Sequence, residues 1–131
     1  MDRIGKHILS DLYGINSKTL EDDKNLMFLF ERTLNKYQFN IVGRLCHKFV
    51  GGGNGVTGIF LLSESHASFH TYPEVDFIAL DLFSCGSTDP ELVLNELIEE
   101  LQPSKVWKAI TERGKDTSHH PRLPIFRGRS F

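Results

Sequence analysis

The sequence predicts an α/β fold of the α+β type: a two-layer sandwich whose antiparallel-rich sheet carries two main helices on one face. Two segments place apolar residues at helical spacing, and the runs between and after them have strand composition. The order of a helix, several adjacent strands, a helix and a strand is typical of this architecture. Neither an internal repeat nor a low-complexity linker suggests a second folding unit.

The first half begins with "KHILSDLYG", a short strand-like run that is followed by turn residues. Asn16 or Ser17 is placed to cap a helix. "FNIVGRLCHKFV", residues 39–50, then has strand composition, and "GGGNG", residues 51–55, predicts a flexible glycine turn. The expected helix carries one apolar stripe, formed by Leu26, Leu29, Phe30, Thr33, Leu34 and Tyr37.

The second half continues with three strand-like runs, the last two separated by a turn at Pro73. Asp89 is expected to cap a second helix that starts at Pro90 and ends before Pro103. "KVWKAITE", residues 105–112, alternates like a final strand. The three runs are "VTGIFLLSE", "SHASFHTY" and "VDFIALDLFSC". The stripe of the second helix is Val93, Leu94, Leu97, Ile98 and Leu101.

The length and composition indicate one globular domain. A chain of 131 residues, 40% of them hydrophobic, is long enough to bury a core without disulfides or metals. We expect a single domain over residues 1–113 and a C-terminal tail over residues 114–131, which is rich in His, Pro and Arg.

The charge and hydropathy pattern exclude several partner classes. A formal net charge of −2 gives no basic patch for nucleic acid. No apolar run approaches the roughly 20 residues of a membrane span, and no apolar signal-peptide core follows Met1. We therefore expect a cytoplasmic protein that contacts neither nucleic acid nor membrane, in which Cys46 and Cys85 are free thiols.

The stretch "LSESHASFHTYPE", residues 62–74, is too polar for an ordinary buried strand, so its side chains need a chemical explanation. His66 and His70 would share one face of a strand but stand roughly 13 Å apart, so we predict no metal site here. The glycine turn lacks the Gly-Lys-Ser/Thr of a phosphate loop. The G-x-S-x-G elbow of serine hydrolases is absent around Ser63 and Ser65.

The same stretch, followed by "FIALDLFSCG", resembles the prokaryotic S-adenosylmethionine decarboxylase proenzymes, a pyruvoyl-dependent family. "GKHILSDLYG", "CHKF" and "GVTG" also match the family's pattern, and the resemblance covers about residues 5–112. The chain departs from the family in the longer turn "VGGGNG" and in Tyr72, where the family commonly has tryptophan or another aromatic residue.

The resemblance implies that the chain cleaves itself between Glu64 and Ser65, and that Ser65 becomes the pyruvoyl cofactor. His70 matches the self-processing histidine, and Thr57 stands where the family has a serine that assists processing. Cys85 matches the catalytic proton donor.

The resemblance also implies a substrate pocket and an assembly. Phe49 and Tyr72 would offer aromatic surfaces for adenine, and Glu74 a carboxylate for the ribose hydroxyls. The expected substrate is a small-molecule amine, S-adenosylmethionine, whose decarboxylated product serves spermidine synthesis. The family pattern implies a homodimer of cleaved protomers with active sites near the interface.

The proposed chemistry requires these residue types. The hydroxyl of Ser65 must attack the carbonyl of Glu64, which needs a nearby base and a stabilised oxyanion. The resulting ester breaks by loss of the Cα proton of Ser65, which His70 is suited to remove. Hydrolysis of the resulting dehydroalanine leaves a ketone, which forms a Schiff base with a substrate amine. The thiol of Cys85 can return a proton to the substrate carbon.

Two alternative functions remain open from the sequence. A pyruvoyl-dependent decarboxylase of ornithine or arginine would keep the mechanism and change the substrate, and the longer turn after Phe49 bears on that choice. An unprocessed regulatory paralogue would need neither Ser65, His70 nor Cys85 as reagents.

Overall fold

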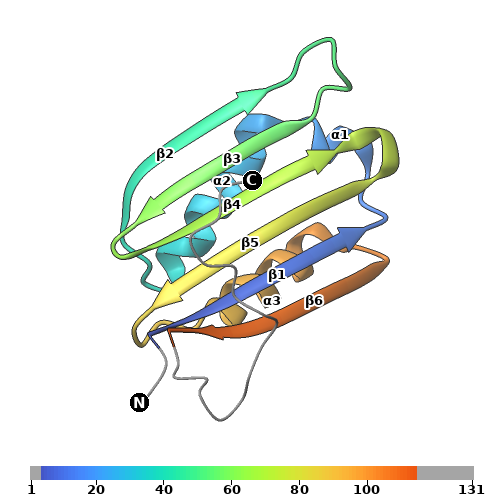
Figure 1. Cartoon of the computed structure of the whole chain (residues 1–131). Helices are drawn as coiled ribbons and strands as arrows, with labels where there is room; N and C mark the ends of the chain where they lie inside the picture. The colour runs from blue at the N-terminus through green and yellow to red at the C-terminus, as the bar shows by residue number, and fades with distance from the viewer. Residues whose placement is uncertain (1–3, 115–131) are drawn as a thin grey trace, which may run out of the picture.

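The structure is a computed structural model that describes residues 4–114, and it confirms the predicted α+β sandwich. Six strands form one antiparallel sheet in the order β2-β3-β4-β5-β1-β6 (Figure 1). The strands are β1 (Gly5–Tyr13), β2 (Ile41–Lys48), β3 (Val56–Leu62), β4 (Ser65–Tyr72), β5 (Phe77–Cys85) and β6 (Lys105–Arg113). The helices are α1 (Ser17–Leu20), α2 (Asp23–Lys36), the 3-10 turn η1 (Pro73–Val75) and α3 (Pro90–Leu101).

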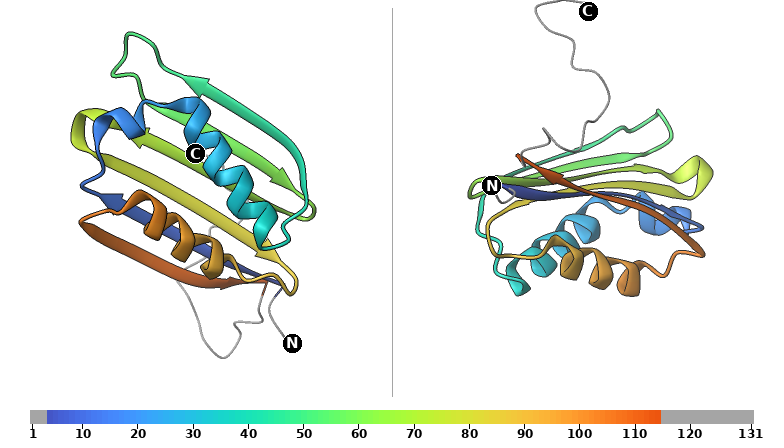
Figure 2. Two further views of the ribbon diagram at one scale, coloured as in Figure 1. Left: turned by 180° about the vertical axis from the view of Figure 1, so that it is seen from behind. Right: turned by 60° about the horizontal axis from the view of Figure 1, so that its bottom comes forward.

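The two long helices cover one face of the sheet, and no other helix or strand of residues 4–114 covers the opposite face, which we call the open face (Figure 2). No helix within residues 4–114 is long and apolar enough to cross a membrane. Residues 115–131 of the predicted tail lie outside the described residues, so its boundary stays a prediction.

The first helical region is divided into two helices, which differs from the single helix that the apolar stripe predicts. Asn16 caps the short α1, because its side chain accepts a hydrogen bond from the backbone N–H of Lys18. Asp22 then caps α2 by accepting from the backbone N–H of Asn25 at 3.2 Å. The second cap starts a new helix where the first one stops, because each side chain satisfies an otherwise unpaired N–H.

Helix α3 begins and ends as the sequence predicts. The side chain of Asp89 accepts from the backbone N–H of Glu91, and Pro90 fills the first helical position. Gln102 adopts the left-handed conformation at φ 50°, which ends the helix before Pro103.

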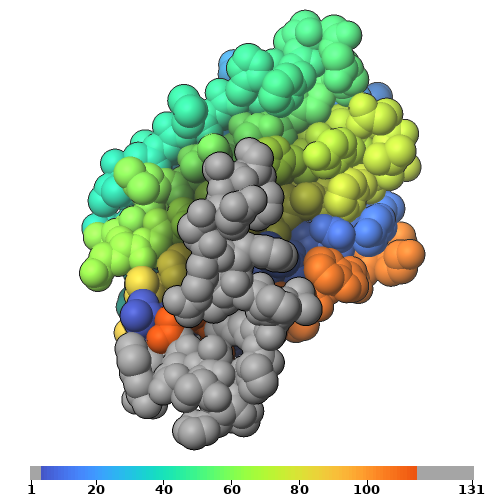
Figure 3. Space-filling model, viewed as in Figure 1, coloured from blue at the N-terminus to red at the C-terminus, as the bar shows by residue number. Residues whose placement is uncertain are grey.

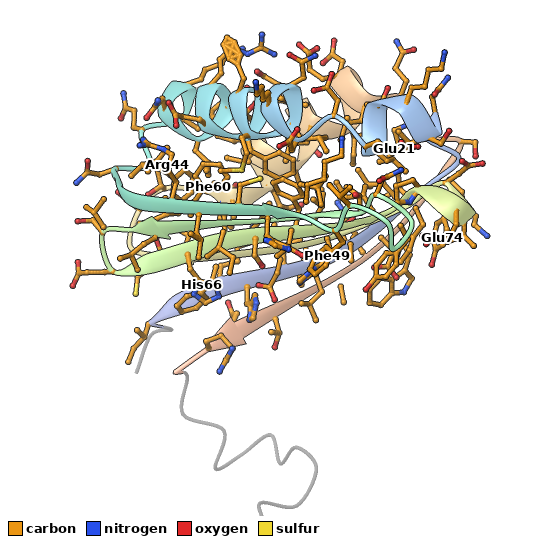
Figure 4. All side chains as sticks on the ribbon, turned by 90° about the horizontal axis from the view of Figure 1, so that it is seen from above. Glu21, Arg44, Phe49, Phe60, His66 and Glu74 are labelled. Atoms are coloured by element: carbon orange, nitrogen blue, oxygen red, sulfur yellow. The ribbon has the colours of Figure 1, made fainter. Side chains whose placement is uncertain are left out.

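The core lies between the helices and the sheet. The ring of Phe30 on α2 stacks on Phe69 of β4, with 4.4 Å between ring centroids, and also faces Phe60 of β3. Figure 4 shows Phe60 between the sheet and α2. Phe60 and Phe69 are both fully buried. Alternate residues of each strand therefore point into the core, and the intervening residues point to the open face.

The open face carries many exposed apolar side chains, although no helix or strand of residues 4–114 packs on it. Figure 3 shows this face, with the side chains of β2, β3 and β4 lying next to one another. The exposed large apolar residues of the open face include Leu9, Leu45, Phe49, Ile59, Leu61, Tyr72 and Trp107. A contiguous apolar surface of this kind marks a contact region rather than a solvated face.

Candidate active site

The predicted cleavage point lies in the two-residue hairpin that joins β3 to β4. Leu62 pairs with Ser65 across this hairpin, so Ser63 and Glu64 form its loop. Glu64 has φ 61°, a left-handed conformation that costs a residue with a side chain roughly 1–2 kcal/mol. Relaxed two-residue hairpins instead place positive φ at the first loop residue or at both. The peptide bond before Ser65 therefore follows a strained residue.

Hydrogen bonds from the preceding segment hold this hairpin in place. The backbone N–H of Ser63 donates to the carbonyl of Asn40 at 2.9 Å. The hydroxyl of Ser65 lies 3.5 Å from the carbonyl oxygen of Ser63, inside the turn. Ser65 is partly buried, while Glu64 is exposed. The nucleophile that the sequence predicts is thus close to the backbone of its own turn.

Cys85 lies on the strand next to Ser65, at the same end of the sheet. β4 and β5 are antiparallel, and His66 pairs with Phe83. The start of β4 and the end of β5 are therefore neighbours, with Cys85 at the level of the hairpin. Cys85 is a free, partly buried thiol outside the hydrophobic core. Its position next to the cleavage point fits a proton donor to a group formed from Ser65.

The other thiol, Cys46, lies in a different environment. It packs against the hydrophobic core, where burial and the nearby Asp23 raise the pKa of the thiol. A raised thiol pKa keeps the sulfur protonated and unreactive. Cys46 is therefore a packing residue.

Thr57 and His70 form a hydrogen-bonded pair at the opposite end of the sheet. They are register partners on β3 and β4, and Thr57 Oγ1 lies 2.9 Å from His70 Nδ1. The hydroxyl fixes the orientation of the imidazole ring, whose exposed side faces away from the helices. This pair supports the sequence prediction that the two residues act together.

A pocket of about 360 Å³ adjoins the Thr57–His70 pair. Its wall includes all three predicted substrate-binding residues, Phe49, Tyr72 and Glu74, each of them exposed. Tyr72 forms the first member of a tier of stacked rings that continues through Phe77 to Tyr13. The pocket thus combines flat aromatic surfaces with one carboxylate, as a nucleoside requires.

The glycine turn beside this pocket is closed by backbone hydrogen bonds to Phe49. The carbonyl of Phe49 accepts hydrogen bonds from the N–H groups of Gly52 and Asn54, and the Phe49 N–H donates to Gly55. A Cβ atom built on Gly53 would come within 2.5 Å of the Glu74 carboxylate. The glycine allows this close approach, which sequence reasoning about the turn did not identify.

Two further residues that the sequence did not indicate support the pocket. The ring of His47 contacts Phe49 edge to face, with 4.6 Å between centroids. The side-chain amide of Asn54 donates to Glu21 at 3.4 Å and so connects the turn to the end of α1. The alternation of β2, which places His47 and Phe49 on one face, was the available sequence signal.

The predicted site residues form two groups that are far apart in one chain. Ser65 and His70 are five residues apart on the same strand, which at about 3.3 Å per residue separates them by roughly 16 Å. Glu64, Ser65 and Cys85 lie at one end of the sheet, and the Thr57–His70 pair and the pocket at the other. Figure 4 shows His66 toward one end and Phe49 and Glu74 toward the other.

Comparisons with known proteins agree with the residue pattern. A model of the family described as S-adenosylmethionine decarboxylase matches residues 6–114. The chain is 32% identical over 112 residues to the S-adenosylmethionine decarboxylase proenzyme of Archaeoglobus fulgidus, which covers 85% of this chain and 98% of that protein. It is 35% identical over 115 residues to the proenzyme of the same name from Methanococcus maripaludis, with 87% and 93% covered.

A solved structure has the same fold. The crystal structure of the adenosylmethionine decarboxylase from Aquifex aeolicus superposes with a TM-score of 0.79 at 28% sequence identity, covering 93% of this chain and 100% of that chain. The family match extends over nearly all of the described residues, from β1 to the end of β6. This chain belongs to the S-adenosylmethionine decarboxylase family.

Proposed function

We propose that this chain is a self-processing, pyruvoyl-dependent decarboxylase that converts S-adenosylmethionine to decarboxylated S-adenosylmethionine, the aminopropyl donor for spermidine synthesis. One observation carries the proposal beyond family membership. The strained Glu64 immediately precedes Ser65, and Cys85 lies at the same level on the neighbouring strand. A hairpin that served only as a turn would need neither a hydroxyl at Ser65 nor a thiol at the same level on the neighbouring strand.

The residues at the hairpin are suited to making the cofactor. The hydroxyl of Ser65 attacks the carbonyl carbon of Glu64, so that the amide becomes an ester and the backbone nitrogen leaves Glu64. Loss of the Cα proton from Ser65 then breaks the ester, which releases the Glu64 carboxylate and leaves a dehydroalanine. Hydrolysis of that dehydroalanine by water yields the ketone and releases the former Ser65 nitrogen as ammonia. The pyruvoyl group that replaces Ser65 supplies an electrophilic ketone, which takes up the electrons left when CO₂ departs.

His70 and Thr57 act on this hairpin from a second protomer. Because His70 lies roughly 16 Å from Ser65 along its own strand, it cannot remove a proton from that residue. If two copies paired through their open faces in opposite directions, the hairpin end of one sheet would lie against the Thr57–His70 end of the other. The exposed apolar residues of that face support such a pairing, which forms two equivalent sites in one homodimer.

The pocket residues support an adenosyl substrate. Phe49 and Tyr72 offer ring surfaces for the adenine, and Glu74 is placed to accept hydrogen bonds from both ribose hydroxyls. Ornithine or arginine would need an acid for its distal cationic group but no stacked rings. The two rings in the pocket wall, Phe49 and Tyr72, therefore favour S-adenosylmethionine over a basic amino acid.

Mass measurement and a substrate comparison test the proposal. Purified protein should contain two fragments, residues 1–64 and a pyruvoyl-blocked fragment of residues 65–131, and Ser65→Ala should remain one chain. Processed enzyme should release CO₂ from carboxyl-labelled S-adenosylmethionine and not from ornithine or arginine. Turnover of an amino acid alone would reject the substrate, and an uncleaved wild-type chain would favour a regulatory paralogue.

A further inference from the structure

A cluster of polar side chains on the open face lies beside the cleavage hairpin. His7 Nε2 is 2.5 Å from Asp81 Oδ1, and His66 Nε2 is 3.7 Å from the same oxygen. On the far side of His7, Arg113 Nη1 lies 2.9 Å from His7 Nδ1. These four residues come from β1, β4, β5 and β6, so the sheet brings them together from distant parts of the sequence.

The partners of His7 define its protonation pattern. A guanidinium group can only donate hydrogen bonds, so Nδ1 of His7 must accept from Arg113. The proton of the neutral ring is then on Nε2, which donates to Asp81. The result is a directed chain of hydrogen bonds that runs from Arg113 through His7 to the carboxylate of Asp81.

The same arrangement argues against a metal ion. His7, His66 and Asp81 offer three ligand atoms that lie within 4.8 Å of one another. A ligating imidazole needs an unprotonated nitrogen toward the metal, and its other nitrogen normally donates to an acceptor. Here Arg113 presents a donor and a positive charge at that position. The cluster is therefore better suited to holding a side chain than a cation.

The side chain that the cluster holds is His66. Its ring lies 5.5 Å from Phe83 and makes an edge-to-face contact with His7 at 6.0 Å between centroids. Asp81 faces its Nε2 atom. The ring thus has neighbours on β1 and β5, although about half of its side chain is exposed.

His66 is the residue that follows Ser65. If Ser65 becomes a pyruvoyl group, the backbone nitrogen of His66 carries it. Phe83 pairs with His66 across β4 and β5, and Cys85 follows Phe83 by two residues on the same face. Fixing the ring of His66 therefore fixes the attachment point of the cofactor relative to the thiol.

We propose that His66 is a positioning residue, and that Arg113, His7 and Asp81 hold its side chain so that the cofactor keeps its register with Cys85. This inference rests on the proposed function. Displacing a reacting group by about 1 Å can reduce the rate about 100-fold, so a positioning device of this kind has a measurable effect. Because Arg113, His7 and Asp81 are hydrogen-bonded to one another, a second protomer could cover the cluster without leaving an isolated buried charge.

Two substitutions of His7 separate hydrogen bonding from packing. His7→Phe keeps a ring against Phe83 and His66 but removes the donor to Asp81. His7→Gln removes the ring and places an amide N–H where the Nε2–H was. Positioning through the hydrogen bond predicts that Gln keeps kcat within about threefold, whereas Phe lowers kcat about 10- to 100-fold at unchanged KM. A packing role predicts the reverse order, which would overturn the proposal.

The comparison requires equal cofactor content, so intact mass must first show the same cleaved fraction in both variants. Asp81→Leu, which has a similar size but removes the acceptor for the Nε2–H of His7, provides a second test if His7→Phe fails to fold, and it should lower kcat in the same direction. Wild-type activity in that folded and cleaved variant would contradict the inference.

A spectroscopic measurement tests the cluster without activity. In ¹⁵N-histidine-labelled wild-type protein, the ring nitrogens of His7 should report the tautomer with the proton on Nε2. A proton on Nδ1, or a zinc titration that shifts His7 and His66 together, would overturn the hydrogen-bond chain. If the wild-type chain is not cleaved, the proposed function fails, while the tautomer measurement still decides on the cluster.

Discussion

At the scale of single residues, the conformation of Glu64 connects the fold to the chemistry. A left-handed φ of 61° is relaxed for glycine and strained for glutamate. The hairpin holds this strain next to the bond that is proposed to break. Cleavage there would release the strain, because the two new chain ends would no longer share a turn.

Replacing Glu64 with glycine should stabilise the uncleaved chain and slow its cleavage. In the Ser65→Ala background, which keeps the chain whole, Glu64→Gly should raise the free energy of unfolding by about 1 kcal/mol. With Ser65 present, removal of that strain should slow self-cleavage by up to about fivefold. Urea unfolding and the time course of fragment appearance measure the two effects. A less stable precursor would show that the turn is not strained.

Cys85 should be needed for turnover and not for the fold. Cys85→Ala should yield a folded, cleaved protein whose decarboxylation is at least about 100-fold slower, because a general acid has been removed. A cysteine that only packs would predict a small loss of stability and near-normal turnover. Cys46→Ala is the matched control, since that thiol lies in the core and should affect stability rather than rate.

At the scale of elements, the turn between β2 and β3 shapes the pocket. Its hydrogen bonds to Phe49 keep the loop closed, and Gly53 lets it approach Glu74. The longer turn sequence therefore does not remove Phe49 from the pocket. It adds a wall opposite Tyr72 instead.

Gly53→Ala should weaken substrate binding without affecting self-cleavage. The new methyl group would displace the Glu74 carboxylate, and loss of its hydrogen bonds to a ribose should raise KM about tenfold. Gly51→Ala is the control, because Gly51 also has positive φ but a methyl group there meets no atom within 4 Å. Steady-state kinetics on fully cleaved enzyme distinguish the two. Equal effects would mean that loop strain, and not contact with Glu74, controls binding.

At the scale of the whole molecule, the separation of Ser65 from His70 means that the proposed mechanism would require a dimer. One chain would hold the proposed nucleophile at one end of its sheet and the proposed base at the other. The open face, with its exposed apolar residues, is the surface through which a second copy would bring the missing group. Neither half of the site would be complete in an isolated protomer.

Co-expression of two inactive variants tests this arrangement. Ser65→Ala cannot be cleaved, and His70→Ala should cleave slowly or stall. In a mixed dimer, the Ser65 of the His70→Ala chain would face the intact His70 of the partner subunit. We therefore expect the His70→Ala chain alone to be cleaved, which intact mass detects. If cleavage is no greater than in the separate variants, the base acts within its own chain.

The sequence alone determined the fold class and the kinds of reactive side chain that the candidate site contains. Apolar spacing located α2 and α3, alternation located the strands, and Asp89, Pro90 and Pro103 marked the bounds of α3. These signals are local, because caps, turns and amphipathic faces depend on residues a few positions apart. The segment from Leu62 to Glu74 likewise indicated a self-processing serine, through its resemblance to the S-adenosylmethionine decarboxylase proenzymes.

Only the tertiary structure decided which of those residues meet. His7, Asp81 and Arg113 lie on three strands that are distant in sequence, and strand order is not encoded in the composition of any one of them. The strand rise separates Ser65 from His70, although they are only five residues apart, while sheet pairing joins Thr57 to His70. Local sequence patterns predict the helices and strands. The pairing of strands that are distant in the sequence decides the distances between the side chains of the candidate site.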